Sequence, residues 1–301
     1  MIKSVNLWKV INQPLYYSFK SKDYFSVLND LGFNSVSIYK EVSLKFIEEA
    51  KKNNFRVFSL LPEVLNPSEK YNFLTDIKGD NFNQICFSES EKWCSNNLRR
   101  LDSSLIDDYI ITDIPWYLSL LSSHSPRKNR HPPFYATYTK DFLLRNNIKI
   151  PNVINFEKEW KWWKLEIEDK LFDLYMLRFL PLLEELKNKW FPITVRDDKV
   201  ENLSSKPIIR NCKKYIDKYN VNVILMNASK QPNLIKRFMN NNLIIGGTEG
   251  ALGLVDEKNG RKLIEKGYNG FVTNEHQLFN NRHPKWSEIK KEINYIEENY
   301  E

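Results

Sequence analysis

The sequence predicts an α/β protein built as a single (β/α)8 TIM barrel, with a long loop insertion after the fourth strand. Short apolar runs alternate with amphipathic stretches, and the alternation occurs eight times along the 301 residues. This pattern is typical of parallel strands covered by the helices that connect them. No repeat of fixed period and no second domain is recognisable. We therefore expect one domain over residues 1–301, with the loop insertion at about 118–155.

The eight predicted strands are short apolar runs that suit parallel strands buried on both faces. They are Lys3–Val10, Ser35–Tyr39, Phe55–Leu61, Tyr109–Thr112, Ile193–Val195, Val221–Met226, Leu243–Ile245 and Phe271–Thr273.

Helices are predicted where apolar residues recur at spacings of three and four. They are Lys22–Leu31, Ser43–Asn53, Ser90–Leu101, Phe156–Lys189, Lys206–Tyr219, Pro232–Asn241, Asp256–Lys266 and Lys285–Glu298. Pro181 predicts a kink or a restart in the longest of them, because proline removes a helical hydrogen bond.

Composition narrows the classes of function. The chain is 42% hydrophobic, enough for a large core, and its net charge of +7 comes from Lys and Arg scattered among acids. Without a dense basic stripe we expect no nucleic-acid partner. No apolar run approaches the roughly 18–20 residues that span a membrane, so we expect no membrane partner. The start of the chain turns polar too soon for a signal peptide, so we expect a cytoplasmic protein. Cys86, Cys94 and Cys212 form no CxxC pair, and we expect no disulfide, metal or cofactor.

The candidate site residues are those that directly follow the predicted strands, since parallel barrels carry their chemistry at the carboxyl ends of the strands. Asp113 follows the fourth strand and Glu249 the seventh, and we predict that they form a catalytic pair. One acid would protonate the leaving oxygen, and the other would attack the sugar or activate water. The predicted substrate-binding residues are Trp8, Tyr39, Lys40, Glu63, Trp116, Arg196, Asp197, Asn227 and Glu275.

Carboxylates and aromatic rings dominate this set, and the combination suits carbohydrates, because aromatic faces pack against sugar rings. An alternative rests on Gly246–Gly253, which holds four of the nine glycines and could form a phosphate-binding loop. That alternative is a phosphodiesterase or a phosphosugar-acting barrel. A third hypothesis is a glycan-binding barrel without catalysis.

Several segments resemble those of glycoside-hydrolase-like TIM barrels. Cys86–Trp93, a predicted helix and then Asp108–Asp113 resemble a stretch of that group in which a helix leads to a strand ending in Asp. His131–Pro151 resembles the segment that follows, and Trp160–Trp163 resembles the Trp-x-x-Trp helix before strand five. The resemblance implies a glycoside hydrolase that acts on an oligo- or polysaccharide and needs no cofactor.

The chain departs from the group at two points. Phe134, Ala136 and Tyr138 lie where members often carry a cluster of cysteines, and Asp113 lacks the Asn-Glu pair of the large retaining clan. By position, the resemblance implies that Asp113 is the acid/base and Glu249 the nucleophile. In other sugar-cleaving barrels an Asp after strand four is itself the nucleophile, so both roles stay open for Asp113.

Overall fold

A computed structural model of the chain describes the barrel strands and most of the helices around them. The described residues are 1–6, 22–39, 43–61, 73–75, 81–85, 92, 95–96, 104–111, 147, 158, 176, 179–194, 207–226, 228–230, 232–238, 242–247, 259–274 and 286–301.

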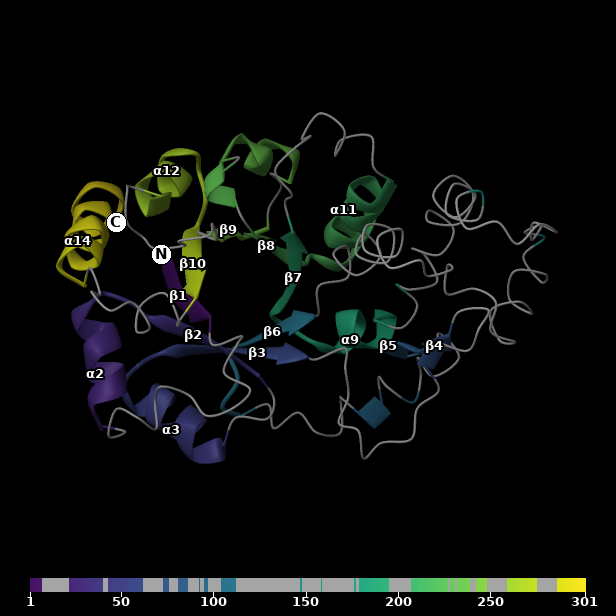
Figure 1. Ribbon diagram of the computed structural model, residues 1–301, viewed down its shortest axis with the longest axis horizontal. Coiled ribbons are helices and arrows are strands. Elements are labelled where there is room, and N and C mark those ends of the chain that lie inside the picture. The colour runs from purple at the N-terminus through teal and green to yellow at the C-terminus, as the bar shows by residue number, and fades with distance from the viewer. Residues whose placement is uncertain are drawn as a thin grey trace.

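Eight parallel strands form a closed barrel, which confirms the predicted fold class (Figure 1). Going round the barrel, the strands follow the order β1-β10-β9-β8-β7-β6-β3-β2. Their bounds are β1 Ile2–Asn6, β2 Ser35–Tyr39, β3 Arg56–Leu61, β6 Asp108–Ile111, β7 Lys189–Thr194, β8 Asn222–Met226, β9 Ile244–Gly247 and β10 Gly270–Asn274. The first and last strands pair along their whole length, from Ile2 with Gly270 to Asn6 with Asn274, and this pairing closes the ring.

Helices surround the barrel (Figure 1). They are α2 Lys22–Asp30, α3 Leu44–Lys52, α9 Leu180–Glu185, α11 Pro207–Tyr219, α12 Asn259–Glu265 and α14 Trp286–Tyr300, with 3-10 turns η4 Ala228–Lys230 and η5 Pro232–Arg237. Local signals fix their ends: the Ser43 hydroxyl caps α3 by accepting from the Phe46 backbone N–H, and Pro181 lies in the first turn of α9. In the part of the chain that the structure describes, no helix is long and apolar enough to cross a membrane.

Three predictions about elements were wrong. A two-stranded antiparallel ribbon, β4 Phe73–Thr75 with β5 Asn81–Ile85, follows β3, where no strand was predicted. Lys189, predicted to end a helix, begins strand β7, because α9 stops at Glu185 and the chain turns in three residues. The predicted helix Pro232–Asn241 is the shorter 3-10 turn η5.

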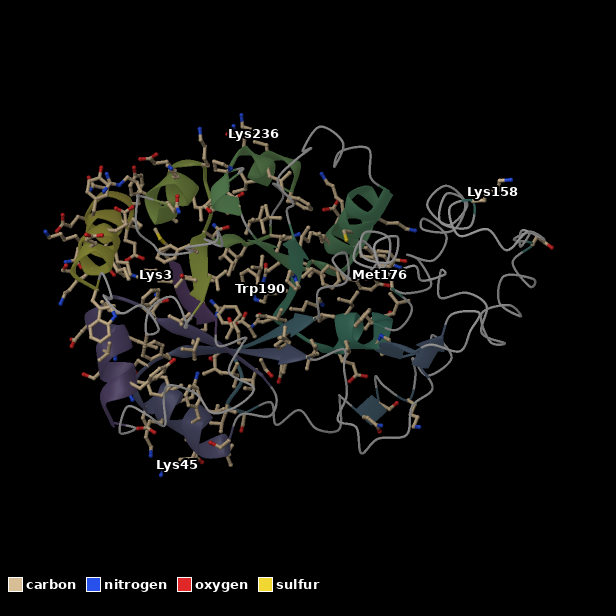
Figure 2. The ribbon with its side chains drawn as sticks, in the orientation of Figure 1. Lys3, Lys45, Lys158, Met176, Trp190 and Lys236 are labelled. Atoms are coloured by element: carbon tan, nitrogen blue, oxygen red, sulfur yellow. The ribbon has the colours of Figure 1, made fainter. Side chains whose placement is uncertain are left out.

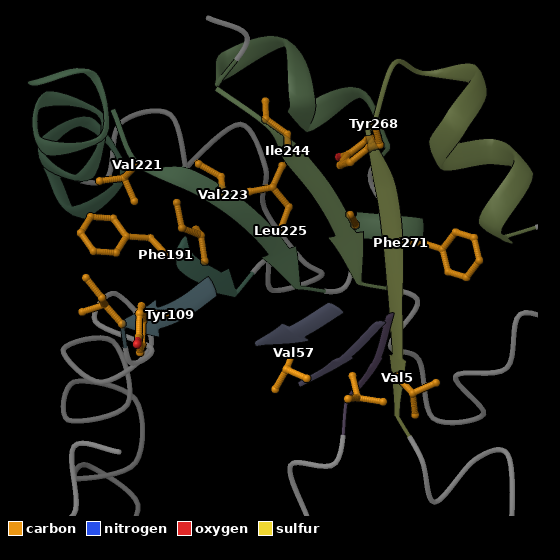
Figure 3. Close-up of a cluster of buried hydrophobic side chains, with 14 of the residues drawn as sticks. Val5, Val57, Tyr109, Phe191, Val221, Val223, Leu225, Ile244, Tyr268 and Phe271 are labelled. Carbon is orange, nitrogen blue, oxygen red and sulfur yellow. The ribbon is translucent and has the colours of Figure 1, made fainter. Parts of the chain in front are cut away.

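Side chains from the strands form two apolar layers, because successive residues of a strand point to opposite faces. The inner layer fills the barrel and consists of Ile2, Phe58, Leu60, Ile110, Trp190, Ile224, Ile245 and Val272. The outer layer packs against the helices, and Figure 3 shows part of it, including Val5, Val57, Phe191, Val223 and Phe271. Strand β3 shows the alternation, with Phe58 and Leu60 inside and Val57 and Leu61 outside.

A buried ion pair lies at the N-terminal end of the barrel. The Asp108 carboxylate is fully buried and accepts hydrogen bonds from Nε and Nη2 of Arg56, at 2.5 and 2.8 Å. It also accepts one from the indole Nε1 of Trp190, at 2.8 Å. Trp190 fills the middle of the barrel (Figure 2), and its ring meets that of Phe58 edge-on at 5.5 Å. These contacts connect β3, β6 and β7 at the N-terminal end of the barrel.

Asparagine side chains brace neighbouring strands at the same end. Asn34 accepts from the Lys3 N–H, Asn222 accepts from the Leu243 N–H, and Asn269 accepts from the Ile244 N–H. Each bond satisfies a backbone donor where a strand begins. Gly270 is needed for closure, because a Cβ at this position would lie 1.9 Å from the carbonyl oxygen of Ile2.

Candidate functional site

The mouth of the barrel is the candidate site. All eight strands are parallel, so their carboxyl ends meet at one end of the barrel. The last residues of the strands are Asn6, Tyr39, Leu61, Ile111, Thr194, Met226, Gly247 and Asn274. In barrels of this kind the connections that leave these ends carry the chemistry.

Most of the predicted site residues lie outside the described residues. Tyr39 is the exception for its backbone: it is the last residue of β2 and pairs with Leu60. The others are Asp113, Glu249, Trp8, Lys40, Glu63, Trp116, Arg196, Asp197, Asn227 and Glu275. The loop insertion at 118–155 is described only at Asn147, an exposed turn residue with φ of 56°. The placement of these side chains relative to one another therefore stays a prediction.

The strand bounds fix where each predicted acid leaves the barrel along the sequence. Strand β6 ends at Ile111, two residues before Asp113, and β9 ends at Gly247, two residues before Glu249. Going round the barrel, β7 and β8 stand between β6 and β9. Each acid thus comes two residues after the end of its strand, and the two strands are not adjacent in the barrel.

The floor of the mouth is apolar on the side of β3, β6 and β8. Leu60, Ile110 and Ile224 are buried members of the inner layer. Below them, Phe58 and Trp190 are fully buried, and the Asp108 ion pair closes the end of the barrel. A substrate would therefore reach the strand ends from the C-terminal side.

Polar side chains also line the barrel interior at β1 and β2, a feature that sequence reasoning missed. Ser4 of β1 and Ser37 of β2 are buried, and their hydroxyl oxygens lie 3.3 Å apart. The fully buried Ser35 hydroxyl has no hydrogen-bond partner among the described residues. The sequence contained a signal for these serines. Successive side chains of a strand point to opposite faces, so Ser35 and Ser37 lie on the same face of the strand as the predicted site residue Tyr39.

The glycine run begins inside a strand. We predicted that the seventh strand ends at Ile245, but β9 continues through Gly246 and Gly247, and both are buried. A Cβ at Gly246 would lie 2.7 and 2.8 Å from the two methyl groups of Leu263 and 3.1 Å from the Tyr268 ring. Close packing of α12 on β9 explains this glycine without a phosphate.

Among the described residues, the titratable groups with altered pKa lie away from the carboxyl ends of the strands. Burial lowers the pKa of Lys189, whose ammonium group donates to the carbonyls of Leu183 and Leu186 at the end of α9. Burial also raises the pKa of Tyr268 far above its usual range, and the nearby Ile235 backbone opposes the shift. Among the described residues, no group of three or more His, Cys, Asp or Glu could hold a metal ion.

Comparison with solved structures identifies the same fold. A β-galactosidase from the psychrophilic Marinomonas ef1 superposes with a TM-score of 0.52 at 8% identity, over 99% of this chain and 59% of the galactosidase. At this identity the match shows a shared barrel fold and nothing finer. The chain spans less than two thirds of the length of that enzyme.

Two further solved structures superpose less well, and similarity at this level does not bear on function. A sugar phosphate isomerase/epimerase from Parabacteroides distasonis matches with a TM-score of 0.37 at 11% identity, over 99% of both chains. A provisionally assigned alpha-L-fucosidase from Bacteroides thetaiotaomicron matches with a TM-score of 0.39 at 13% identity, over 99% of this chain and 94% of that one. No protein-family profile and no curated protein sequence matches the chain.

Proposed function

We propose that the chain is a glycoside hydrolase that cleaves an oligo- or polysaccharide with Asp113 and Glu249. The observation that carries the proposal is the strand geometry: both acids come two residues after a strand of a closed parallel barrel. The similarity of the fold to a β-galactosidase barrel is compatible with it. A carbohydrate substrate as the partner and a cytoplasmic location belong to the same proposal.

The proposed reaction needs two carboxyl groups on opposite sides of the glycosidic bond. One is protonated and gives its proton to the leaving oxygen as the bond to the anomeric carbon breaks. The other, as a carboxylate, attacks the anomeric carbon itself or takes a proton from the attacking water. In the first case, water then releases the sugar from the enzyme, and the first carboxylate regains its proton by activating that water.

Two substitutions test the assignment. We expect Asp113→Asn and Glu249→Gln each to lower kcat on a panel of glycans by about 10²- to 10⁴-fold, the usual contribution of a positioned acid or base. Asp30→Asn and Glu298→Gln are matched controls, because both acids are exposed on helices. If both mouth variants turn over glycans like the wild type, the proposal is wrong.

The stereochemical outcome separates the two possible roles of the second acid. Proton NMR of the first sugar released shows whether the anomeric configuration is retained or inverted. Retention requires carboxyl groups about 5–5.5 Å apart, and inversion requires roughly 6.5–9.5 Å. A crystal structure with a carboxyl separation far outside both ranges would exclude the pair.

The phosphate alternative loses part of its basis, because Gly246 and Gly247 are buried strand residues. A phosphate ion bound at Gly246–Gly250 in a crystal structure would restore it. The third hypothesis, a barrel that binds glycans without cleaving them, predicts no turnover on any substrate and an affinity for sugars that survives both acid substitutions.

A further inference from the structure

A large pocket lies at the end of the barrel opposite the mouth. It has a volume of about 990 Å³, and residues that precede or begin β1, β2, β3, β9 and β10 line it together with the end of α14. This volume is at the upper end of the range that small-molecule sites occupy. The lining residues are Met1, Ile2, Asn34, Asn54, Arg56, Leu243, Ile264, Tyr268, Asn269, Tyr300 and Glu301.

Several residues that line the pocket are apolar. Leu243 is 37% exposed and Tyr300 is 42% exposed, whereas Ile264 and Tyr268 are buried. The Tyr300 hydroxyl lies 3.3 Å from Oε1 of Glu265, to which it donates, and this contact ties the ring to α12. An accessible aromatic ring suits the apolar face of a sugar ring.

Other residues that line the pocket present hydrogen-bonding groups on planar side chains. Arg56 is 37% exposed and uses Nε and Nη2 for Asp108, so Nη1 has no partner among the described residues. Asn54 and Asn269 are both exposed at the pocket. The Asn269 side-chain oxygen accepts from the Ile244 N–H, and its NH₂ group has no partner among the described residues. A guanidinium and two amides offer the donors and acceptors that vicinal hydroxyl groups pair with.

The two charged side chains that line the pocket, Arg56 and Glu301, are already paired. Asp108 neutralises Arg56, and the side chain of Glu301 lies 3.1 Å from the Met1 amino group. A strongly charged ligand would have to displace one of these partners. A neutral ligand that is rich in hydroxyl groups would not.

We propose that this pocket is a second carbohydrate-binding site, which holds sugar units of a glycan and takes no part in its cleavage. The location of the site comes from the pocket in the structure, and the choice of a carbohydrate as its ligand rests on the proposed function. Tyr300 and Leu243 receive a ring face, while Arg56, Asn54 and Asn269 bind hydroxyl groups.

Affinity electrophoresis in gels that contain a soluble polysaccharide tests the site, because it detects weak binding. We would use amylose, a soluble cellulose derivative and a galactan, in an Asp113→Asn/Glu249→Gln background that cannot consume them. Tyr300→Ala removes the ring, Tyr300→Phe keeps it, and Asn54→Gly removes an amide from a residue whose φ of 62° glycine tolerates. Leu44→Ala and Asn220→Gly are matched controls, since Leu44 is 53% exposed and Asn220 has φ of 50°, and neither lines the pocket.

We expect the dissociation constant for the retained polysaccharide to rise at least about tenfold in Tyr300→Ala and Asn54→Gly, with Tyr300→Phe and both controls unchanged. A tenfold change is about 1.4 kcal/mol, within reach of one aromatic contact. Retention that is equal in Tyr300→Ala and the background protein would overturn the site, and so would the absence of retention in all three gels. Retention that depends on Tyr300 in a protein without glycan turnover would keep the site and reject the proposed hydrolase.

Discussion

Breaking the buried ion pair at the N-terminal end of the barrel should destabilise the protein, and removing the whole pair should destabilise it less. Arg56→Met takes away two of the three hydrogen bonds of Asp108, whose side chain is fully buried. Among the described residues, the carboxylate would keep only the bond from Trp190 Nε1. A buried charge that loses its partner typically costs about 3–5 kcal/mol. For a chain of this length, that corresponds to a fall of about 5–8 °C in Tm.

The double variant Arg56→Met/Asp108→Leu leaves no buried charge, because apolar side chains replace both partners. The remaining cost is the Trp190 N–H without an acceptor, about 1–3 kcal/mol. We therefore expect its Tm to lie about 3 °C above that of Arg56→Met. Thermal unfolding followed by circular dichroism at 222 nm measures both. The matched control is Lys51→Met, which breaks a pair with Asp107 whose side chains are each 33% exposed. It should cost about 0–1 kcal/mol.

The comparison among these variants decides the outcome. A double variant that unfolds at or below the Tm of Arg56→Met would show that the apolar pair does not fit the end of the barrel. If Arg56→Met lowers Tm no more than Lys51→Met does, then the burial of Asp108 does not determine how much stability is lost with its partner.

Two further substitutions test the packing between β9, α12 and β10. Tyr268→Phe removes a buried hydroxyl that has no hydrogen-bond partner of normal geometry among the described residues, so unfolding at pH 7 should require about 1 kcal/mol more. Because burial raises the pKa of Tyr268 in the folded protein, the unfolded chain loses this proton first, so stability falls as pH rises above the unfolded pKa of 10.0. Urea unfolding at pH 7 and pH 10.5 should therefore show a smaller alkaline loss in Tyr268→Phe, and an unchanged loss would contradict this. Gly246→Ala should lower Tm by about 2–5 °C, the effect of overpacking a core by about 1–3 kcal/mol, because its Cβ would lie within 2.8 Å of Leu263. A wild-type Tm would show that Leu263 moves aside freely.

Most of the barrel was predictable from local pattern. The second strand was predicted with its observed bounds, because Ser35–Tyr39 is a short alternating run between clear turn residues. The helix predicted over Ser43–Asn53 matches α3 closely, and Pro181, where a kink or restart was predicted, lies in the first turn of α9, since caps and proline act within one turn. The ribbon β4–β5 was missed because its strands, Phe73–Thr75 and Asn81–Ile85, are short and mostly polar, and the cross-strand partner that stabilises each is not visible in its own sequence.

The ion pair at the N-terminal end illustrates what local pattern does not contain. Arg56 and Asp108 are 52 residues apart, and Trp190 is a further 82 residues along the chain. Taken alone, each of these three residues is an ordinary polar or aromatic residue near the start of a strand. Only the order of strands in the closed barrel brings β3, β6 and β7 together, and only then does Asp108 acquire its partners.

The two ends of the barrel differ in how strongly the sequence determines them. Connections from a helix to the next strand are short: residues 31–34 before β2, 53–55 before β3 and 220–221 before β8. They turn on residues with positive φ, among them Gly32 at 89° and Asn54 at 62°, which leaves the chain few alternative paths. Intervals from a strand to the next described element differ in length: residues 40–43 follow β2, whereas the longer interval 248–258 follows β9. Entropy alone allows such lengths many conformations, and contacts between distant connections must select one. Asp113 and Glu249 stand in connections of this second kind. Their order along the sequence is therefore a good guide to the strand each one follows, and a poor guide to the distance between their carboxyl groups.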